Sequence, residues 1–313
     1  MAGRKIIVET PARIHFGIIN PFKLDTRRFI STGVGVDTPR NRIVVYPEMK
    51  HDISGCRSSE VSEKLKPIIE EYGLENGYVV IEECIPKHTG LGSTTQLLLG
   101  VALGLLVANG KREDLITIAR KLGLGRVSGV GTYVFIHGGF IVDTGVKNNS
   151  YPNLLFHADF PEEWRFIVIV PSGRGLSDKE EERVFSTPIE VDASLSWKAS
   201  HTLFTKMIPS LLERDFEEFS HALRELQEYV GGMFSSVQGG VFAESSCRYI
   251  ELLKQLGVVG VGQSSWGPTV YGLVENELKA QILLERIKSL IDNSVRVFIA
   301  RPQNRGARLY IEN

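Results

Sequence analysis

A glycine-rich turn that leads into an apolar helix is the part of this chain best suited to bind an anion. Its sequence is PKHTGLGSTTQ, residues 86–96. Glycines in such a turn lack a Cβ and let the backbone approach a ligand closely. The first N–H groups of the helix have no partner within it, and together with the helix dipole they attract phosphate. The residues predicted to bind phosphate are Lys87, Gly90, Leu91, Gly92, Ser93 and Thr94, with His88 beside them.

Short glycine motifs also occur in ordinary strand-to-helix turns, so the rest of the chain has to decide between the two interpretations. Two further segments carry polar side chains next to glycine. They are TPARIHFG at 10–17 and GQSSWGPT at 262–269. No Walker segment and no Rossmann glycine fingerprint is present, which argues against the common nucleotide-binding folds.

These three segments resemble, in order and approximate spacing, the three motifs of the GHMP superfamily, which includes the galacto-, homoserine, mevalonate and phosphomevalonate kinases. The resemblance covers nearly all 313 residues. It implies an α+β, GHMP-kinase-like two-domain fold. The N-terminal domain, residues 1–161, would resemble ribosomal protein S5 domain 2, and residues 162–313 would form a ferredoxin-like domain.

One position departs from the kinases of that superfamily. Their Ser-Gly-x-Asp segment supplies an aspartate that acts on the substrate hydroxyl. Here the corresponding segment is Ser128-Gly129-Val130-Gly131, followed by a Gly-Gly pair at 138–139. Gly131 cannot accept a proton, so a kinase reaction would need another base or none.

Several segments are similar to one branch that lacks this aspartate, the archaeal β-ribofuranosylaminobenzene 5′-phosphate synthases of methanopterin biosynthesis. They include RIHFG at 13–17, GLGSTTQ at 90–96, GGFIVD at 138–143, GRGLS at 173–177 and GQSSWGPTVY at 262–271. The resemblance implies a transferase that joins phosphoribosyl pyrophosphate to 4-aminobenzoate or 4-hydroxybenzoate and releases carbon dioxide and pyrophosphate. Mg²⁺ and no organic cofactor would be expected, and a homodimer is possible. Two alternatives stay open: an ATP-dependent small-molecule kinase and a silent phosphate-binding relative.

The same resemblance assigns roles to other polar residues. The catalytic candidates are Arg13, His15, Arg28 and Ser128. The candidates for substrate binding are Asn20, Thr132, Arg174, Gln263, Ser264 and Trp266. Arginine suits bidentate contact with phosphate or carboxylate, although a surface ion pair is the alternative for each. Trp266 would stack on the aromatic ring or lie in the core. Asn20 stands where the synthase branch leads us to expect an acidic residue, and no metal ligand is identified.

Composition narrows the possible partners. A net charge of −1 gives no basic surface for nucleic acid or anionic membrane. The apolar run at 97–108 is too short to span a bilayer, and the N-terminus is typical of a strand rather than a signal sequence. Cys56, Cys84 and Cys247 form neither a disulfide framework nor a zinc pattern, which favours a reducing, cytoplasmic location.

Hydrophobic periodicity predicts the elements that would position these residues. Strands are expected at 4–9, 42–47, 77–85, 139–144, 165–170, 258–262, 269–274, 295–300 and 307–311. Helices are expected at 59–73, 94–109, 112–122, 193–208, 211–230, 244–256 and 276–291. In the helix at 94–109, two glycines would allow close packing against a sheet.

Overall fold

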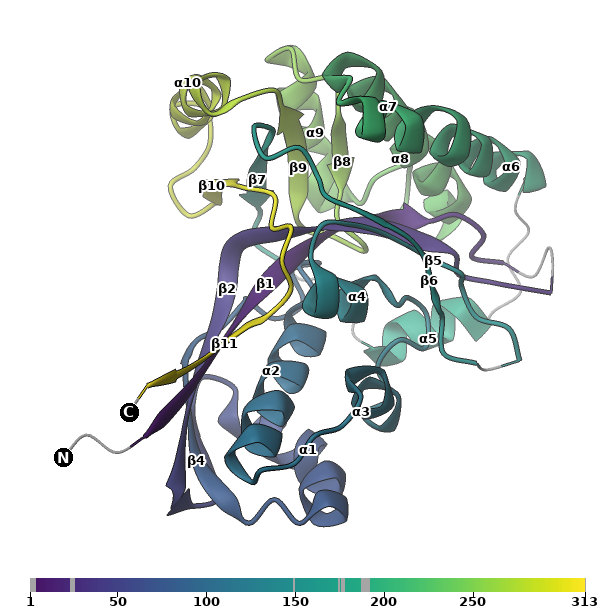
Figure 1. Ribbon diagram of the computed structural model, residues 1–313. Coiled ribbons are helices and arrows are strands. Elements are labelled where there is room, and N and C mark those ends of the chain that lie inside the picture. The colour runs from purple at the N-terminus through teal and green to yellow at the C-terminus, as the bar shows by residue number, and fades with distance from the viewer. Residues whose placement is uncertain are drawn as a thin grey trace.

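The computed structural model describes residues 4–22, 26–148, 150–173, 175, 178–186 and 192–312. These residues form two β-sheets with helices packed against them (Figure 1). The α+β class predicted from the sequence is therefore confirmed.

The first sheet is built around two long antiparallel strands, β1 (Lys5–Ile18) and β2 (Ser31–Lys50). Among the described residues its order is β11-β1-β2-β4-β3, with β5 paired to β2 and β6 to β5. The other bounds are β3 Asp52–Gly55, β4 Asn76–Glu83, β5 Phe140–Asp143, β6 Leu154–Ala158 and β11 Arg308–Glu312. β1 continues past the predicted end at residue 9 because a register shift between Thr10 and Ala12 accommodates Pro11.

Helix α2 (Ser93–Ala108) lies against β1 and β2 and fixes the position of the glycine turn that precedes it. Gly100 and Gly104 face the sheet. A Cβ on Gly100 would lie 2.6 Å from Ile43 Cδ1, and one on Gly104 would lie 2.8 Å from Val45 Cγ2. The close packing predicted for these glycines is confirmed.

The remaining helices of the first half lie on the same side of β1 and β2 as α2 in Figure 1. They are α1 (Ser58–Tyr72), α3 (Leu115–Lys121) and α4 (Val130–His137). The Asp114 carboxylate caps α3 by accepting from the Thr117 N–H at 2.9 Å. Helix α4 is not predicted from the sequence, because it is short and almost uniformly apolar.

The second sheet has the order β10-β7-β9-β8 within the described residues. Its strands are β7 (Arg165–Val170), β8 (Val261–Gln263), β9 (Val270–Val274) and β10 (Arg296–Ala300). The helices of this half are α5 (Asp178–Ser186), α6 (Ala193–Thr202), the π-helical segment η1 (Leu203–Met207), α7 (Ile208–Glu213), α8 (Phe216–Gln238), α9 (Glu244–Gln255) and α10 (Glu277–Lys288). Residue 161 separates β6 of the first sheet from β7 of the second, whereas the last strand, β11, returns to pair with β1.

One hydrophobic core joins the two halves. Phe16 of β1 packs against Phe140 of β5 and Tyr271 of β9, with ring centroids 6.2 and 5.6 Å apart. Phe219 of α8 contacts Phe140 and Phe160 edge-on. Helix α8 thereby packs against β1, and its side chains reach the first of the three motifs.

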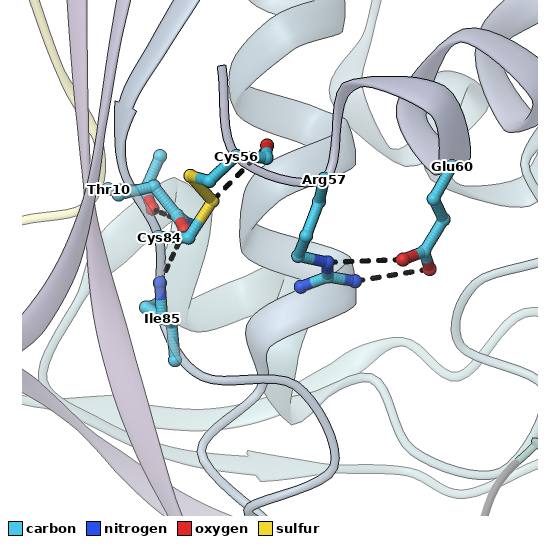
Figure 2. Close-up of a disulfide and its surroundings, with 7 residues drawn as sticks. Thr10, Cys56, Arg57, Glu60, Cys84 and Ile85 are labelled. Carbon is cyan, nitrogen blue, oxygen red and sulfur yellow. Dashed lines mark hydrogen bonds and ion pairs between the residues drawn. A yellow bond between two sulfur atoms is a disulfide. The ribbon is translucent and has the colours of Figure 1, made fainter.

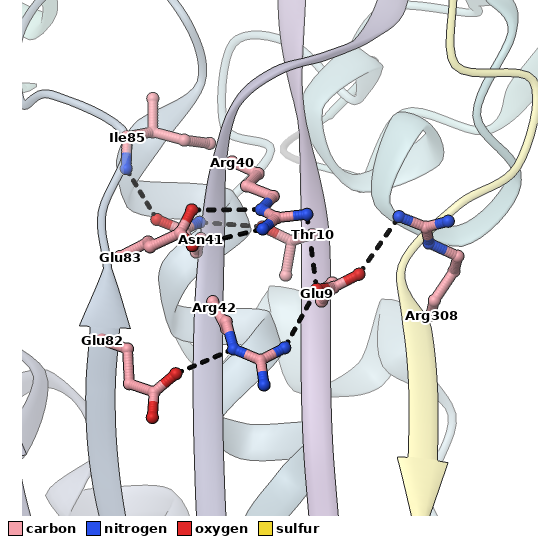
Figure 3. A network of polar contacts seen from close by, with 9 residues as sticks. All are labelled: Glu9, Thr10, Arg40, Asn41, Arg42, Glu82, Glu83, Ile85 and Arg308. Carbon is pink, nitrogen blue, oxygen red and sulfur yellow. Dashed lines mark hydrogen bonds and ion pairs between the residues drawn. The ribbon is translucent and has the colours of Figure 1, made fainter.

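A chain of ion pairs crosses four neighbouring strands of the first sheet (Figure 3). Glu9 of β1 accepts from Arg42 of β2 and Arg308 of β11, each at 3.1 Å. Arg40 and Arg42 also donate to Glu83 and Glu82 of β4. Such partly exposed pairs stabilise by only about 0–1 kcal/mol each, but they fix the register of β11 beside β1.

Cys56 and Cys84 form a disulfide, so the expectation that the cysteines carry none is wrong for this pair. Cys56 follows β3 and Cys84 follows β4, and β3 and β4 pair in parallel, which brings the two thiols together. The pairing of Cys56 with Cys84 was not predicted from the sequence because β3 was not among the expected strands. Cys247 is free and exposed.

Of the helices in the described ranges, none has both the length and the apolar character required to cross a membrane.

Candidate functional site

The three sequence motifs meet at Ser264. Its hydroxyl accepts from the His15 N–H at 2.9 Å and donates to the Gly90 carbonyl at 2.6 Å. Residues more than 170 positions apart are thus joined by one buried side chain, which is 0% exposed. The structure places the predicted residues His15, Gly90 and Ser264 in one site.

The glycine turn leaves the N-terminus of α2 uncapped. Gly90 and Gly92 have φ of 80° and 76°, a left-handed conformation that favours glycine. Gly92 is the N-cap residue and offers no side chain to the helix N–H groups, and Ser93 begins the helix with its side chain largely buried. The dipole and free N–H groups of a 16-residue helix therefore remain available for an anion.

Arg13 forms one wall of this turn. Its backbone N–H donates to the Leu91 carbonyl at 3.1 Å, and its guanidinium donates to the Gly90 carbonyl. A Cβ on Gly92 would lie 2.7 Å from Arg13 Cγ, so glycine is required there for the approach. Burial lowers the pKa of Arg13 to about 10, against the attraction of Glu181, and the guanidinium stays charged at neutral pH.

A second arginine, which was not predicted from the sequence, contacts the first turn of α2. Arg57 donates to the Thr94 hydroxyl at 3.0 Å. It also donates to Glu60 at 3.1 Å (Figure 2). Lys87 also pairs with Glu60, at 3.0 Å. Burial opposes ionisation of Glu60, yet hydrogen bonds from Arg57 and Lys87 hold its pKa at about 2. No motif marks Arg57 in the sequence, because only the fold brings the start of α1 beside α2.

The disulfide fixes both ends of this charged group. Cys56 immediately precedes Arg57, and Cys84 lies three residues before Lys87. Figure 2 shows Cys56 and Arg57 on the connection between β3 and α1, with Cys56 bonded to Cys84 after β4.

A pocket with a cavity volume of about 40 Å³ opens beside His15 and the third motif. Its walls are mixed. Aromatic and aliphatic side chains come from Val230, Phe234, Val241, Phe242 and Trp266, and amide groups come from Gln227, Gln238 and Gln263. Most of these residues belong to α8 or the segment after it, which the sequence analysis left out of the site. An apolar pocket with a few polar groups is typical of small-molecule sites.

The predicted residues Gln263 and Trp266 lie in the wall of this pocket. The side-chain amide oxygen of Gln263, Oε1, accepts from the Ala243 N–H at 2.9 Å, which attaches the segment after α8 to the third motif. The Trp266 indole N–H donates to Glu181 at 2.8 Å, and its ring meets Phe234 edge-on with centroids 4.8 Å apart. Trp266 is thus both a packed residue and a wall of the pocket.

His15 and Ser128, predicted as catalytic, are in contact. His15 Nε2 lies 3.0 Å from Ser128 Oγ, and the imidazole is only 4% exposed. Burial and the nearby Arg13 guanidinium lower the pKa of His15 well below 6.5, so the ring is neutral at physiological pH.

Gly131 lies next to the first turn of α2. A Cβ at this position would be 3.3 Å from Thr95 Cγ2, and the Gly131 carbonyl accepts from Gln96 Nε2 at 2.7 Å. A carboxylate at position 131 would therefore face the N-terminus of α2, which is where a base that activates a substrate hydroxyl is needed. Gly131 provides no side chain for this role.

Three predicted residues have structural partners away from the pocket. Arg28 donates to the carbonyls of Pro21 and Phe185 at 3.1 and 3.0 Å. The Asn20 side chain closes the loop before β2 through Arg27 and Ile30. Thr132 accepts from the Tyr151 hydroxyl at 2.6 Å. Arg174 lies outside the described residues.

Within the described ranges, no group of three or more His, Cys, Asp or Glu side chains is arranged to hold a metal ion. The arrangement offers unpaired N–H groups at the start of α2, which suit an anion, and beside His15 a pocket lined by apolar and amide side chains.

Comparisons with known proteins agree with this geometry. Residues 60–139 match the GHMP kinases N terminal domain, and residues 207–293 match the domain described as GHMP kinases C terminal. The chain is 28% identical to the beta-ribofuranosylphenol 5′-phosphate synthase of Methanothermobacter thermautotrophicus, over 87% of this chain and 90% of that protein. It is 26% identical to the protein of the same name from Methanocaldococcus jannaschii, over 97% and 100%.

Solved structures share the fold. A homoserine kinase from Cytophaga hutchinsonii superposes with a TM-score of 0.72 at 17% identity, covering 98% of this chain and 97% of that one. A mevalonate diphosphate decarboxylase from Enterococcus faecalis gives 0.68 at 15% identity, with 98% of both chains covered.

Proposed function

The chain belongs to the GHMP superfamily, and we propose that it is a synthase that joins phosphoribosyl pyrophosphate to a para-substituted benzoate. Carbon dioxide and pyrophosphate would be released. The observation that carries this proposal is the absence of a side chain at Gly131, in a site whose phosphate-binding turn is otherwise complete. Relatives named as synthases match nearly end to end, which supports the same conclusion.

The missing carboxylate fits the chemistry of this reaction. A kinase must remove a proton from the attacking hydroxyl. In the proposed reaction the nucleophile is the ring carbon that bears the carboxylate, and this carbon has no proton. It forms a C–C bond to the anomeric carbon as the C–O bond to pyrophosphate breaks. The C–CO₂ bond then breaks, and its electrons restore the aromatic ring.

What such a reaction needs from the protein is anion stabilisation and alignment of the two substrates. The α2 N-terminus, Ser93 and the Arg13 guanidinium would stabilise the departing pyrophosphate. Arg57 would add a second positive charge through its contact with Thr94. The apolar pocket beside His15 would hold the ring, with Trp266 and Phe234 in its walls.

Mg²⁺ would fit this site as a companion of the substrate. The ion is commonly held by substrate phosphates plus one or two protein oxygens, and the described residues offer no larger cage. Ser93, the first residue of α2, would supply such an oxygen. Bound there, Mg²⁺ would neutralise charge on the pyrophosphate.

The acceptor we favour is 4-hydroxybenzoate. The relatives are named as ribofuranosylphenol phosphate synthases, and a phenol product requires a hydroxybenzoate as the acceptor. 4-Aminobenzoate is the other candidate. We further propose that the enzyme works in the cytoplasm. There a disulfide such as Cys56–Cys84 is unusual except in proteins of hyperthermophiles.

The test is the release of labelled carbon dioxide from each carboxyl-labelled benzoate, with phosphoribosyl pyrophosphate and Mg²⁺. A parallel reaction replaces the sugar pyrophosphate with ATP. We expect release that depends on the sugar pyrophosphate and is fastest with 4-hydroxybenzoate. ATP-dependent phosphorylation of a small alcohol, with no release from either benzoate, would favour the kinase alternative and refute the synthase.

A further inference from the structure

Four polar side chains form a continuous chain behind the pocket; His15, Ser31 and Asp143 are buried and Ser128 is half-buried. Ser128 Oγ lies 3.0 Å from His15 Nε2 and 2.7 Å from Ser31 Oγ. Ser31 Oγ in turn lies 2.7 Å from Asp143 Oδ2. The residues come from β1, the turn before α4, the start of β2 and the end of β5, so the fold alone brings them together.

Asp143 sets the direction of every hydrogen bond in this chain. Its carboxylate also accepts from the N–H groups of Gly129 and Gly145, at 2.7 and 2.9 Å, and from the Ser31 N–H at 3.2 Å. Burial raises the pKa of Asp143 to about 6, and these hydrogen bonds limit the rise. At pH 8 the group is therefore ionised and accepts only.

The ionised Asp143 carboxylate determines where the protons lie along the chain of four side chains. Ser31 has one hydroxyl hydrogen, and it must point to Asp143. Ser128 must then give its own hydrogen to Ser31, and its oxygen accepts from the Val130 N–H at 3.2 Å. The remaining lone pair of Ser128 can only accept, so the proton of the neutral His15 ring lies on Nε2.

The other ring nitrogen is left as an acceptor. His15 Nδ1 is buried and has no hydrogen-bond partner among the described residues. A buried polar atom without a partner is costly, which points to a ligand group that satisfies it. His15 lines the pocket together with Phe234 and Trp266.

We propose that Asp143, Ser31 and Ser128 are positioning residues that hold His15 with Nδ1 unprotonated, so that Nδ1 accepts a hydrogen bond from the substituent opposite the carboxylate of the acceptor ring. This inference rests on the proposed function for the identity of the ring. The proposal requires the substituent opposite the carboxylate to be a hydrogen-bond donor, such as a hydroxyl or amino group. A methoxy group of similar shape would leave Nδ1 unsatisfied.

The tautomer can be measured without substrate. Nitrogen-15 NMR of the full chain at pH 8 separates protonated from unprotonated ring nitrogens, and a His15→Gln variant identifies the signals of His15. We expect the proton on Nε2 in the wild type and a mixture of tautomers in Ser31→Ala. Ser31→Thr, which keeps a hydroxyl, should retain the wild-type tautomer.

Ser220→Ala is the matched control. Ser220 is a buried serine of α8 whose hydroxyl has no partner in the described part of the chain, so its removal should not affect His15. A wild-type His15 protonated on Nδ1, or a Ser31→Ala tautomer identical to the wild type, would overturn the positioning role.

Steady-state kinetics test whether the acceptor must carry a hydrogen-bond donor opposite its carboxylate. In the wild type, kcat/KM for 4-hydroxybenzoate should exceed that for 4-methoxybenzoate by at least about tenfold. Ser31→Ala should reduce this ratio and leave the KM for phosphoribosyl pyrophosphate unchanged. A change confined to that KM would overturn the assignment of Nδ1 to the acceptor. If the tautomer is as expected but no benzoate releases carbon dioxide, the proposed function and the acceptor assignment both fail, whereas the positioning role is supported.

Discussion

Replacing Ser264 with alanine should loosen the junction of the three motifs. The hydroxyl is fully buried, accepts from the His15 N–H at 2.9 Å and donates to the Gly90 carbonyl at 2.6 Å. After the substitution the Gly90 carbonyl still accepts from Arg13, but the His15 N–H has no remaining partner among the described residues. Leaving one buried donor unsatisfied costs about 1–3 kcal/mol. For a chain of this size, each kcal/mol lowers Tm by roughly 2–4 °C.

Thermal unfolding followed by circular dichroism measures this shift, and Ser220→Ala is again the control. That substitution removes a hydroxyl that is equally buried but makes no hydrogen bond to the described residues, so its Tm should stay close to the wild-type value. Because Gly90 belongs to the phosphate-binding turn, Ser264→Ala should also raise the KM for phosphoribosyl pyrophosphate. If both variants unfold at the same temperature, the junction does not depend on this hydroxyl and the reasoning is wrong.

Three other substitutions test the charges of the site and the disulfide beside it. Gly131→Asp would place a carboxylate beside Thr95 and the α2 N-terminus, where it would repel the pyrophosphate. Steady-state kinetics should give a KM for phosphoribosyl pyrophosphate about tenfold above that of the Gly131→Ala variant. An equal KM in the two variants would contradict this placement. Glu60→Gln would release the cations that Glu60 now pairs with, which include Arg57, Lys64 and Lys87. Calorimetry should then show inorganic pyrophosphate binding about three- to tenfold more tightly, with the gain lost at high salt, whereas unchanged affinity would exclude these cations from the site. Cys84→Ser opens a disulfide that links residues 28 positions apart, so the free energy of unfolding should fall by about 3–4 kcal/mol. A reductant should lower the Tm of the wild type but not of the variant. If the wild-type Tm does not respond to reductant, the Cys56–Cys84 disulfide does not stabilise the fold as argued.

The sequence was sufficient where the signal is local. The α2 helix and its glycine turn follow from an apolar run preceded by Gly90 and Gly92, and their position in the structure is close to the prediction. Short elements were missed because few residues define them. β3, β6 and α4 have between four and eight residues each. Without β3, the approach of Cys56 to Cys84 had no sequence signal.

The site was only partly predictable for the same reason. Arg13, His15 and Ser264 lie on glycine-rich motifs that a reader can recognise in the sequence. Arg57 and Ser31 have no motif around them, and their roles depend on contacts between segments far apart in the chain. Asn20 and Arg28 were predicted from residue type as substrate-binding and catalytic residues. In the structure their side chains donate to backbone carbonyls of the loop before β2, and their roles stay predictions.

The positions of Gly131 and Asp143 together suggest how one fold can serve two reactions. A carboxylate at 131 would stand at the phosphate-binding helix, where it could take a proton from a hydroxyl. The carboxylate of Asp143 instead lies behind the site, and the two serines connect it to the far side of His15. There it can set the tautomer of an imidazole but cannot reach a substrate, because it is fully buried and already accepts four hydrogen bonds. Such an arrangement suits a nucleophile that has no proton to lose and only needs to be held in position. On this reasoning, adding a carboxylate at 131 would not by itself create a kinase, since the pocket would still hold a flat ring beside an imidazole acceptor.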